Sequence, residues 1–292
     1  MARRRAGARV TNWDVTHHHL THGGRRIRWY SAGPADAALT VMWHHGTPNT
    51  GEPPEPLFEA SAARNIRWLG FDRGGYGESD RHEGRSIADA AQVALAVADD
   101  AGVERFAALG HSGGGPHAIA AAAIAPERVM AIVSVSGLAP FNADNLDWYA
   151  GMHHGGEAEL RAAQAGAGEL ETLLAATEFD PEMFTPADWE ALEGQWAWFN
   201  TIAAQGVAHG LGGAVDDDRA YVTHWGVDLS RVTAPVVLVH GTDDRIVPIA
   251  HSRWLAEHLP TAQLWVREGA GHISALGDGT EVLDWLCSAR DR

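Results

Sequence analysis

The chain has 292 residues, of which 45% are hydrophobic and 21% are charged, and its formal net charge at pH 7 is −16. This length and composition predict a soluble globular protein with one large buried core. The strong negative charge excludes a typical nucleic-acid-binding protein, because phosphate binding needs a basic surface. No run approaches the roughly 20 apolar residues that span a bilayer, so no membrane segment is expected.

The cysteine content and the N-terminal arginines both bear on location. Cys287 is the only cysteine in the sequence, so no intrachain disulfide can form. Its apolar position in the last predicted helix suits a small core residue. The basic cluster within residues 3–9 is followed by no apolar segment, so it does not open a secretory signal. We therefore expect a cytoplasmic protein.

The first elements of the chain are strands. Residues 13–31 alternate polar and apolar side chains around a turn at Gly23, which predicts a hairpin. The triplet 17–19 is three histidines on this hairpin. Neighbouring side chains of a strand point to opposite faces, so the three cannot converge on one metal ion. The apolar runs 39–43 and 66–71 are each typical of a buried parallel strand.

The middle of the chain alternates between helix and strand. Ser86 and Asp89 form a capping-box signature for a helix that runs to about residue 101. A short strand begins at Phe106 and runs directly into an alanine-rich helix over 116–125, and residues 130–136 form a further buried strand. This alternation predicts a mostly parallel sheet with helices on both faces.

Residues 139–226 have a different character, since they contain helix-length segments rich in Ala, Glu and Trp and no convincing strand. They predict an all-helical insertion, here called the cap, after the sixth strand. The expected core then comprises residues 1–138 and 227–292, because strand and helix alternation resumes near residue 234. We expect the acidic residues of the cap, including 216–218, to form a solvated face that weakly disfavours polyanionic substrates.

The most informative stretch is Gly110-His111-Ser112-Gly113-Gly114, between a predicted strand and a predicted helix. A serine projecting from so tight a turn needs a strained backbone and small residues two positions away on either side. The helix behind it directs its amide groups and positive dipole end toward any negative charge that forms there. The pattern Gly-x-Ser-x-Gly resembles the nucleophile elbow of the α/β-hydrolase family. The pentapeptide alone also recurs by chance, so other motifs must decide.

The resemblance implies a catalytic acid and base, which follow the serine in the order that this family uses. The family spacing Gly-x-x-Asp-x-x-Val-Pro, read from Gly241, implies Asp244 as the acid, with Asp243 as the runner-up and more typical of a turn residue. Some members carry the acid after the sixth strand, where this chain has Ser136 and no carboxylate. The implied base is His272, in a Gly-Ala-Gly-His loop after a strand.

The resemblance also implies an oxyanion hole built from two backbone amides. One belongs to Gly113, directly after the serine. The other belongs to Thr47, in the stretch His-Gly-Thr-Pro that is similar to the His-Gly-x-Pro loop of the family. Residues 72–79 match a further family signature, which we interpret as a structural turn with Arg73 near the pocket. The resemblance covers roughly residues 25–290.

These motifs predict a cofactor-independent serine hydrolase that cleaves a carboxylic ester, lactone or thioester. The expected partner is a small molecule with an apolar acyl or alcohol group, and no cofactor or metal is expected. Ser112 attacks the carbonyl, His272 transfers the proton, and Asp244 orients His272. Thr47 and Gly113 bind the oxyanion. The natural substrate, its acyl chain length, the cap aromatics that line the pocket and the oligomeric state stay open.

Other activities of the fold also stay open. A perhydrolase of the haloperoxidase-like type, a carbon–carbon hydrolase, a hydroxynitrile lyase and an aminopeptidase are alternatives, although this chain lacks the His-Gly-Gly-Pro-Gly of prolyl iminopeptidases. Haloalkane dehalogenases and epoxide hydrolases need an aspartate where this chain has Ser112, so they are disfavoured. The alternative of another class is a non-catalytic small-ligand receptor on the hydrolase scaffold.

Overall fold

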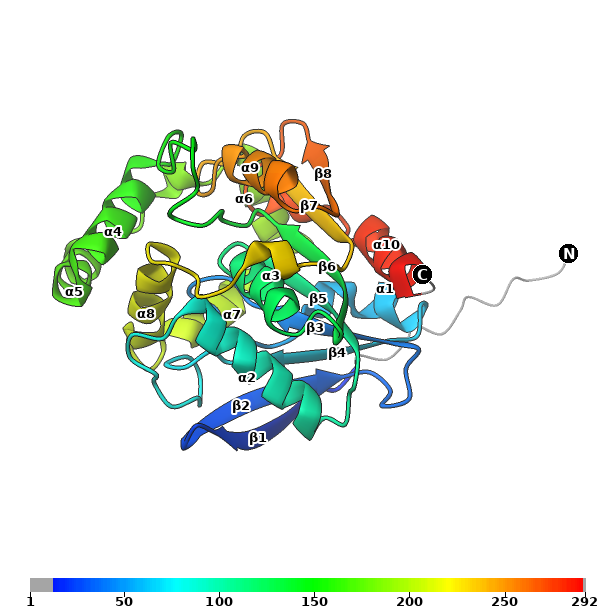
Figure 1. The fold of residues 1–292 in the computed structure, drawn as a ribbon. Helices are drawn as coiled ribbons and strands as arrows, with labels where there is room; N and C mark the ends of the chain where they lie inside the picture. The colour runs from blue at the N-terminus through cyan, green and yellow to red at the C-terminus, as the bar shows by residue number, and fades with distance from the viewer. Residues whose placement is uncertain (1–12, 291–292) are drawn as a thin grey trace, which may run out of the picture.

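The computed structural model describes residues 13–290 and shows one twisted sheet between layers of helices (Figure 1). Its eight strands lie in the order β1-β2-β4-β3-β5-β6-β7-β8. β2 pairs antiparallel with β1 and β4, and all other neighbours pair parallel. The strands are β1 (Thr16–His22), β2 (Arg25–Ala32), β3 (Leu39–His44), β4 (Ile66–Phe71), β5 (Phe106–His111), β6 (Val129–Val135), β7 (Val236–Gly241) and β8 (Ala262–Arg267). The predicted fold class is confirmed.

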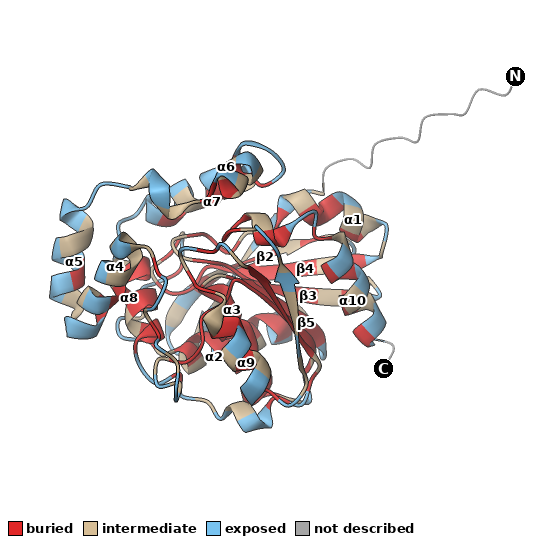
Figure 2. Cartoon of the chain, turned by 90° about the horizontal axis from the view of Figure 1, so that it is seen from above, coloured by how far each residue is buried: buried red, intermediate tan, exposed pale blue. Residues whose placement is uncertain are grey.

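Helices cover both faces of the sheet, as expected for mostly parallel strands. The core helices are α1 (Phe58–Ala62), α2 (Ile87–Asp100), α3 (Gly114–Ile124), α9 (Ala250–His258) and α10 (Thr280–Arg290). The core has two buried clusters: one contains residues of α2, α3 and α9, and the other contains residues of α1 and α10. Figure 2 shows the central strands buried and the helices exposed on their outer sides.

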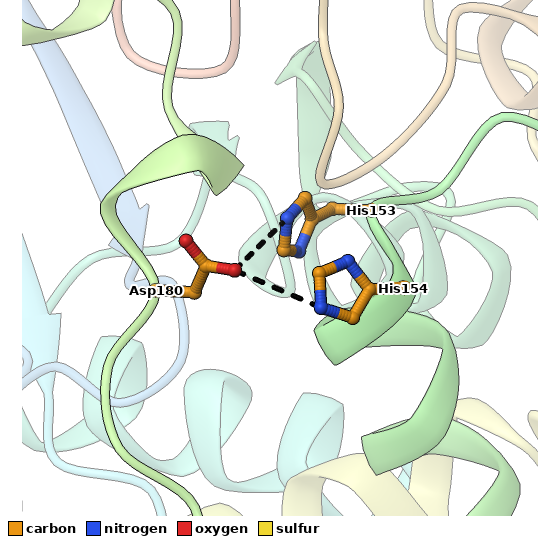
Figure 3. A group of neighbouring side chains, drawn as sticks. All are labelled: His153, His154 and Asp180. Atoms are coloured by element: carbon orange, nitrogen blue, oxygen red, sulfur yellow. Dashed lines mark ion pairs between the residues drawn. The ribbon is translucent and has the colours of Figure 1, made fainter.

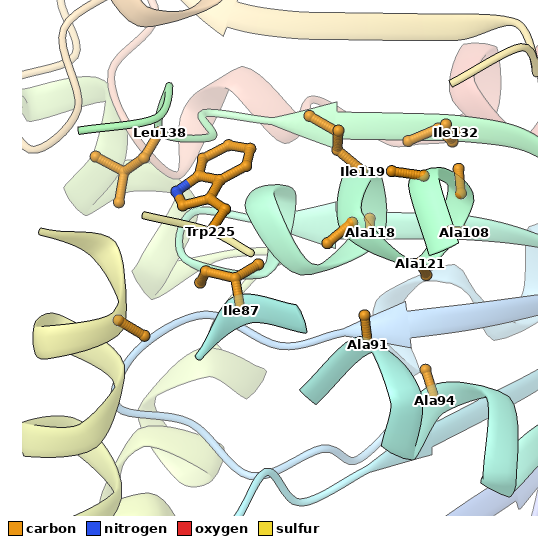
Figure 4. Packing of buried hydrophobic residues seen from close by; sticks show 14 of the residues in the cluster. Ile87, Ala91, Ala94, Ala108, Ala118, Ile119, Ala121, Ile132, Leu138 and Trp225 are labelled. Carbon is orange, nitrogen blue, oxygen red and sulfur yellow. The ribbon is translucent and has the colours of Figure 1, made fainter. Parts of the chain in front are cut away.

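Small side chains let α2 and α3 pack closely over the sheet. Ala91 and Ala94 on α2 lie across from Ala121 on α3, and all three are fully buried (Figure 4). α2 begins where the sequence predicts, after the capping box of Ser86 and Asp89. This packing places the N-terminus of α3 behind the turn that carries Ser112.

The described residues between β6 and β7 form helices and irregular segments and no strand, as predicted for an insertion after the sixth strand. The helices are α4 (His154–Ala165), α5 (Ala167–Ala176), α6 (Pro186–Glu193), α7 (Trp198–Val207) and α8 (Gly212–Tyr221). Residues of α4, α5 and α8 join one core cluster, and residues of α6 and α7 join the other. The cap is therefore packed into the core on both sides of the strand ends.

The parallel strands bring distant segments to one edge of the sheet, because their carboxyl ends point the same way. The loops after β3, β5, β7 and β8 hold Thr47, Ser112, Asp244 and His272, respectively. Of the helices in residues 13–290, none combines the length and the apolar character that crossing a membrane requires.

Candidate active site

Ser112 lies in a sharp turn between β5 and α3, in the left-handed region with a φ of 54°. This conformation is unfavourable for a residue with a side chain, so the surroundings must hold it. A side chain at Gly110 would overlap the carbonyl of Gly114, and one at Gly114 would overlap the carbonyl of His44. The two glycines are therefore required by close backbone packing, and Ser112 is left partly exposed at the apex.

His272 and Asp244 meet at the ends of β8 and β7. Nδ1 of His272 lies 2.9 Å from Oδ2 and 3.1 Å from Oδ1 of Asp244, and both residues are buried. Oδ1 of Asp244 also accepts the amides of Ile246 and Val247, each at 2.9 Å. Burial disfavours the ionised carboxylate, but the neighbouring His272 and hydrogen bonds from His240 and His272 outweigh it and hold the pKa of Asp244 below its usual range.

Asp243, the runner-up for the acid, has a different environment. Its side chain is exposed and accepts the hydroxyl of Thr242 at 3.0 Å, and its amide donates to the carbonyl of Ala270 at 2.9 Å. These are the contacts of a turn residue. His240, which sequence reasoning did not single out, is fully buried, and its Nε2 lies 3.3 Å from Oδ2 of Asp244.

Residues beside Ser112 contact the backbone of His272. The amide of Ser112 donates to the carbonyl of Val135 at 2.8 Å, and the next residue, Ser136, donates its hydroxyl to the carbonyl of His272 at 3.2 Å. Nε2 of His111 donates to the same carbonyl at 3.1 Å, and the two imidazole rings lie 5.0 Å apart. The structure thus pairs His272 with Asp244 and packs the His272 loop against His111, which directly precedes Ser112. It also gives Ser136 a supporting contact that the sequence did not reveal.

Thr47 and Gly113 lie together next to Ser112. A Cβ atom at Gly46 would be 3.4 Å from Cβ of Ser112, so the loop after β3 packs against the serine. A Cβ at Gly113 would be 3.1 Å from Oγ1 of Thr47 and would overlap the hydroxyl of Tyr221. Tyr221, from the cap helix α8, lies 2.8 Å from Oγ1 of Thr47 and was not predicted.

Two histidines hold the peptide groups of this loop and turn. Nδ1 of His45 donates to the carbonyl of Gly46, and Nδ1 of His117 donates to the carbonyl of Gly113, each at 2.7 Å. Burial first, and the nearby Arg73 second, keep the pKa of both imidazoles well below the usual value, so both are neutral. Fixing these carbonyls restricts the loop and the turn in which Thr47 and Gly113 lie.

Arg73 is fully buried beneath the Thr47 loop. Its Nη1 and Nη2 donate to the carbonyls of His45 and Gly46 at 2.6 and 3.1 Å, and its Nε donates to Oδ1 of Asp217 at 2.9 Å. The expected structural turn at 72–79 is present, since the amide of Tyr76 donates to the carbonyl of Arg73 and the amide of Ser79 to that of Tyr76, each at 3.0 Å. Arg73 is therefore part of the support of the site.

The acidic run of α8 corrects one expectation. Residues 216–218 are buried rather than solvated, and α8 packs Asp216 and Asp217 onto basic side chains. Asp217 pairs with both Arg73 and Arg85, and Asp216 pairs with Arg81. Burial opposes ionisation of Asp217, but the two arginines hold its pKa well below the usual range. The signal in the sequence was Arg73 itself, which needs a partner if the turn is buried.

One group within residues 13–290 has an arrangement that could hold a metal ion, namely His153, His154 and Asp180 (Figure 3). Oδ2 of Asp180 lies 3.4 and 3.7 Å from the two Nε2 atoms. Nδ1 of His153 accepts the amide of Gly155, so a neutral ring carries its proton on Nε2 and has no lone pair there for a metal. The geometry favours a hydrogen-bonded cluster. The cluster adjoins the loop after β7 that carries Asp244, because the amide of His153 donates to the carbonyl of Arg245.

The family model described as alpha/beta hydrolase fold matches residues 40–278. The chain belongs to the α/β-hydrolase fold family. It is 29% identical to a non-heme chloroperoxidase of Streptomyces lividans over 90% of this chain and 95% of that protein. It is 26% identical to a 2-hydroxy-6-oxononadienedioate/2-hydroxy-6-oxononatrienedioate hydrolase of Cupriavidus pinatubonensis over 82% of this chain and 81% of that protein.

Solved structures agree on the architecture of this α/β hydrolase. A thermophilic esterase from Thermogutta terrifontis superposes with a TM-score of 0.71, over 94% of this chain and 99% of that one, at 18% sequence identity. At such identity the likeness shows the fold alone. The fold and the names of the relatives together support a hydrolase, and the bond that it cleaves must be argued from the site.

Proposed function

We propose that this α/β hydrolase is a cofactor-independent serine hydrolase that cleaves a carboxylic ester, lactone or thioester through an acyl-enzyme on Ser112. The observation that carries the proposal is the pairing of His272 with the buried, ionised Asp244 at the strand edge that also presents Ser112. A serine hydroxyl becomes an effective nucleophile when an oriented imidazole accepts its proton. The left-handed turn at Ser112 supports the same role.

The proposed mechanism has two halves. Oγ of Ser112 attacks the substrate carbonyl while Nε2 of His272 accepts the hydroxyl proton, and His272 then gives that proton to the leaving alcohol or thiol. In the second half, water attacks the carbonyl carbon of the acyl-enzyme while His272 accepts a proton from it, and His272 then gives that proton to Oγ of Ser112 as the carboxylic acid leaves. Asp244 holds His272 through Nδ1 and stabilises its charged form. The amides of Thr47 and Gly113 bind the oxyanion in both halves.

A perhydrolase is the second candidate, and the non-heme chloroperoxidase at 29% identity favours it. In that case the same acyl-enzyme is attacked by hydrogen peroxide instead of water and yields a peracid. The two activities differ only in the second nucleophile, so they are separated by measuring peracid formation in the presence of peroxide. The relative named for 2-hydroxy-6-oxononadienedioate suggests vinylogous diketo acids as further test substrates.

The deciding experiment assays the purified protein against p-nitrophenyl esters from acetyl to long acyl chains, with Ser112→Ala in parallel. We expect turnover in the wild type, loss of turnover in the variant, and labelling of the wild type alone by a fluorophosphonate. Labelling without ester turnover would keep the nucleophile and redirect the search to a specialised acyl substrate. The absence of both labelling and turnover would overturn the proposal and favour a ligand-binding receptor.

A further inference from the structure

Asp188 lies in the first turn of the cap helix α6 and closes its capping box. The amide and hydroxyl of Thr185 donate to Oδ2 of Asp188 at 3.0 and 2.9 Å, and the amide of Asp188 donates back to Oγ1 of Thr185 at 3.2 Å. Asp89 makes the equivalent bonds with Ser86 at the start of α2. A capping box normally stabilises its own helix, and within residues 13–290 the side chain of Asp89 hydrogen-bonds only Ser86.

The carboxylate of Asp188 differs because it also binds the loop after β8. Oδ2 accepts the amide of His272 at 3.1 Å, and Oδ1 accepts the amides of Ile273 and Ser274, each at 2.8 Å. The hydroxyl of Ser274 donates to Oδ1 at 2.9 Å. A side chain at Gly271 would overlap this carboxylate, so the loop approaches it as closely as backbone can.

Three successive amides directed at one buried carboxylate form a strong, charge-assisted arrangement. Asp188 is fully buried. Burial opposes its ionisation, but the amides and hydroxyl of the loop, together with Thr185, hold its pKa below the usual value. The carbonyl of His272 is in turn held by Ser136 and His111. The peptide groups on both sides of the His272 side chain are therefore fixed, one of them by a residue of the cap.

We propose that Asp188 is a positioning residue of the active site: its carboxylate sets the backbone of His272 and so directs the imidazole between Asp244 and Ser112. The inference rests on the proposed function, in which His272 is the base. A positioned base must hold its geometry within a fraction of an ångström for efficient proton transfer. The cap would then contribute to catalysis through α6.

The test compares Asp188→Asn with Asp89→Asn. Both changes remove the charge of a capping-box aspartate, but only the first removes acceptors of the His272 loop. With a p-nitrophenyl ester, we expect Asp188→Asn to lower kcat by about 10- to 100-fold with KM within about twofold. Asp89→Asn should leave both constants within about twofold of wild type. Equal kcat values for the two variants would overturn the proposal.

A second readout does not depend on turnover. The proton on Nδ1 of His272 donates to Asp244 and should give a low-field proton resonance, assigned by its loss in His272→Ala. We expect this resonance to shift or broaden in Asp188→Asn and to stay in place in Asp89→Asn. An unchanged resonance in a folded Asp188→Asn protein would show that the carboxylate only stabilises α6. If Asp188→Asn does not fold, Ser274→Ala removes the hydroxyl that donates to Asp188 and accepts the amide of Gly271, and it should lower kcat by a smaller factor without raising KM.

Failure of the proposed function is recognised separately. Full ester turnover by both Ser112→Ala and His272→Ala would overturn the serine hydrolase assignment. The resonance of the Nδ1 proton would still decide whether Asp188 positions His272, because it reports the contact with Asp244 in the resting protein.

Discussion

Nδ1 of His272 lies 2.9 Å from Oδ2 of Asp244, whereas the adjacent Asp243 turns its carboxylate to solvent. The two aspartates follow one another at the end of β7, so one step along the chain decides which of them faces the imidazole. The amides of Ile246 and Val247 hold the chosen carboxylate in place. The two positions form a natural pair for mutagenesis.

Asp244→Asn should lower kcat/KM for an ester substrate by about 10³- to 10⁴-fold, because an amide cannot hold His272 in the required tautomer or stabilise its charge. Asp243→Asn should leave kcat/KM within about twofold, because its side chain contacts only the turn. Steady-state kinetics on the two purified variants would check this. A larger loss in Asp243→Asn than in Asp244→Asn would reverse the assignment.

Asp217→Asn should destabilise the fold strongly, because it leaves Arg73 and Arg85 buried with no counter-charge. Breaking a buried pair by removing one partner costs about 3–5 kcal/mol in the free energy of unfolding. Asp216→Asn is the matched control on the same helix, since the side chain of its partner Arg81 is 37% exposed and partly solvated. Urea unfolding followed by tryptophan fluorescence measures both. Equal decreases in the free energy of unfolding of the two variants would show that breaking the buried pair of Arg73 and Asp217 costs no more than breaking the partly exposed one.

Gly113→Ala should reduce activity at least about tenfold, because the new methyl group would occupy the position of the Tyr221 hydroxyl and crowd Thr47. Removing the obstructing ring with Tyr221→Ala should make the alanine at position 113 better tolerated. The double variant would then lose less than the sum of the two single losses in free energy. Strict additivity of the two effects on kcat/KM would show that the contact with Tyr221 does not limit residue 113.

Stability should fall as the pH drops below neutrality, because several buried histidines stay neutral in the folded protein. Burial is the largest cause and lowers the pKa of His44 and His111 to about 3 and of His251 to about 4. An unfolded histidine binds a proton near pH 6.5, so below that pH the unfolded state holds more protons. The contribution of these neutral histidines to the free energy of unfolding is fully present above about pH 6.5. It is lost progressively as the pH falls toward the folded-state pKa values.

Each such histidine should lower the free energy of unfolding by about 1.4 kcal/mol for each pH unit below about 6.5, down to its folded-state pKa. Urea unfolding at pH values between 5 and 8 would show the slope. His251 donates from Nε2 to the carbonyl of Trp148 and accepts the amide of Ala139 at Nδ1, and an amide side chain can make both kinds of bond. In His251→Gln the slope should decrease by about one proton. A slope unchanged by this substitution would assign the acid sensitivity to other groups.

Local patterns were sufficient to predict most of the fold. Period-two alternation, apolar runs and one capping box placed the strands and α2 within a few residues, and the helical insertion was recognised by its lack of strands. α3 begins at Gly114 rather than Pro116, because Gly113 already has helical dihedral angles. The short α1 was not predicted. Four short motifs also identified the residues that lie at the carboxyl ends of the parallel strands.

The supporting residues could not be found in this way, because their partners are far apart in the sequence. Arg73 and Asp217 are separated by 144 positions, and Asp188 and His272 by 84. Both aspartates lie in helices, and charged residues of a helix usually lie on its solvent-exposed face. Only the tertiary packing shows that these two are buried. The positions of Asp243 and Asp244 illustrate the opposite case, since their spacing from Gly241 was a local signal.

The buried pair of Arg73 and Asp217 has a consequence for how this enzyme and its relatives can diverge. A helical insert that supplies the counter-charge of the core is not an interchangeable module, because exchanging it for another leaves a guanidinium stranded under the Thr47 loop. Recombination within the cap is then confined to parts that carry no such charge. α5, which lies away from the sheet in Figure 1, is better placed to vary than α4, whose Glu159 interacts with the buried Asp218 of α8. A cap exchange that retains activity should therefore keep α8 together with Arg73.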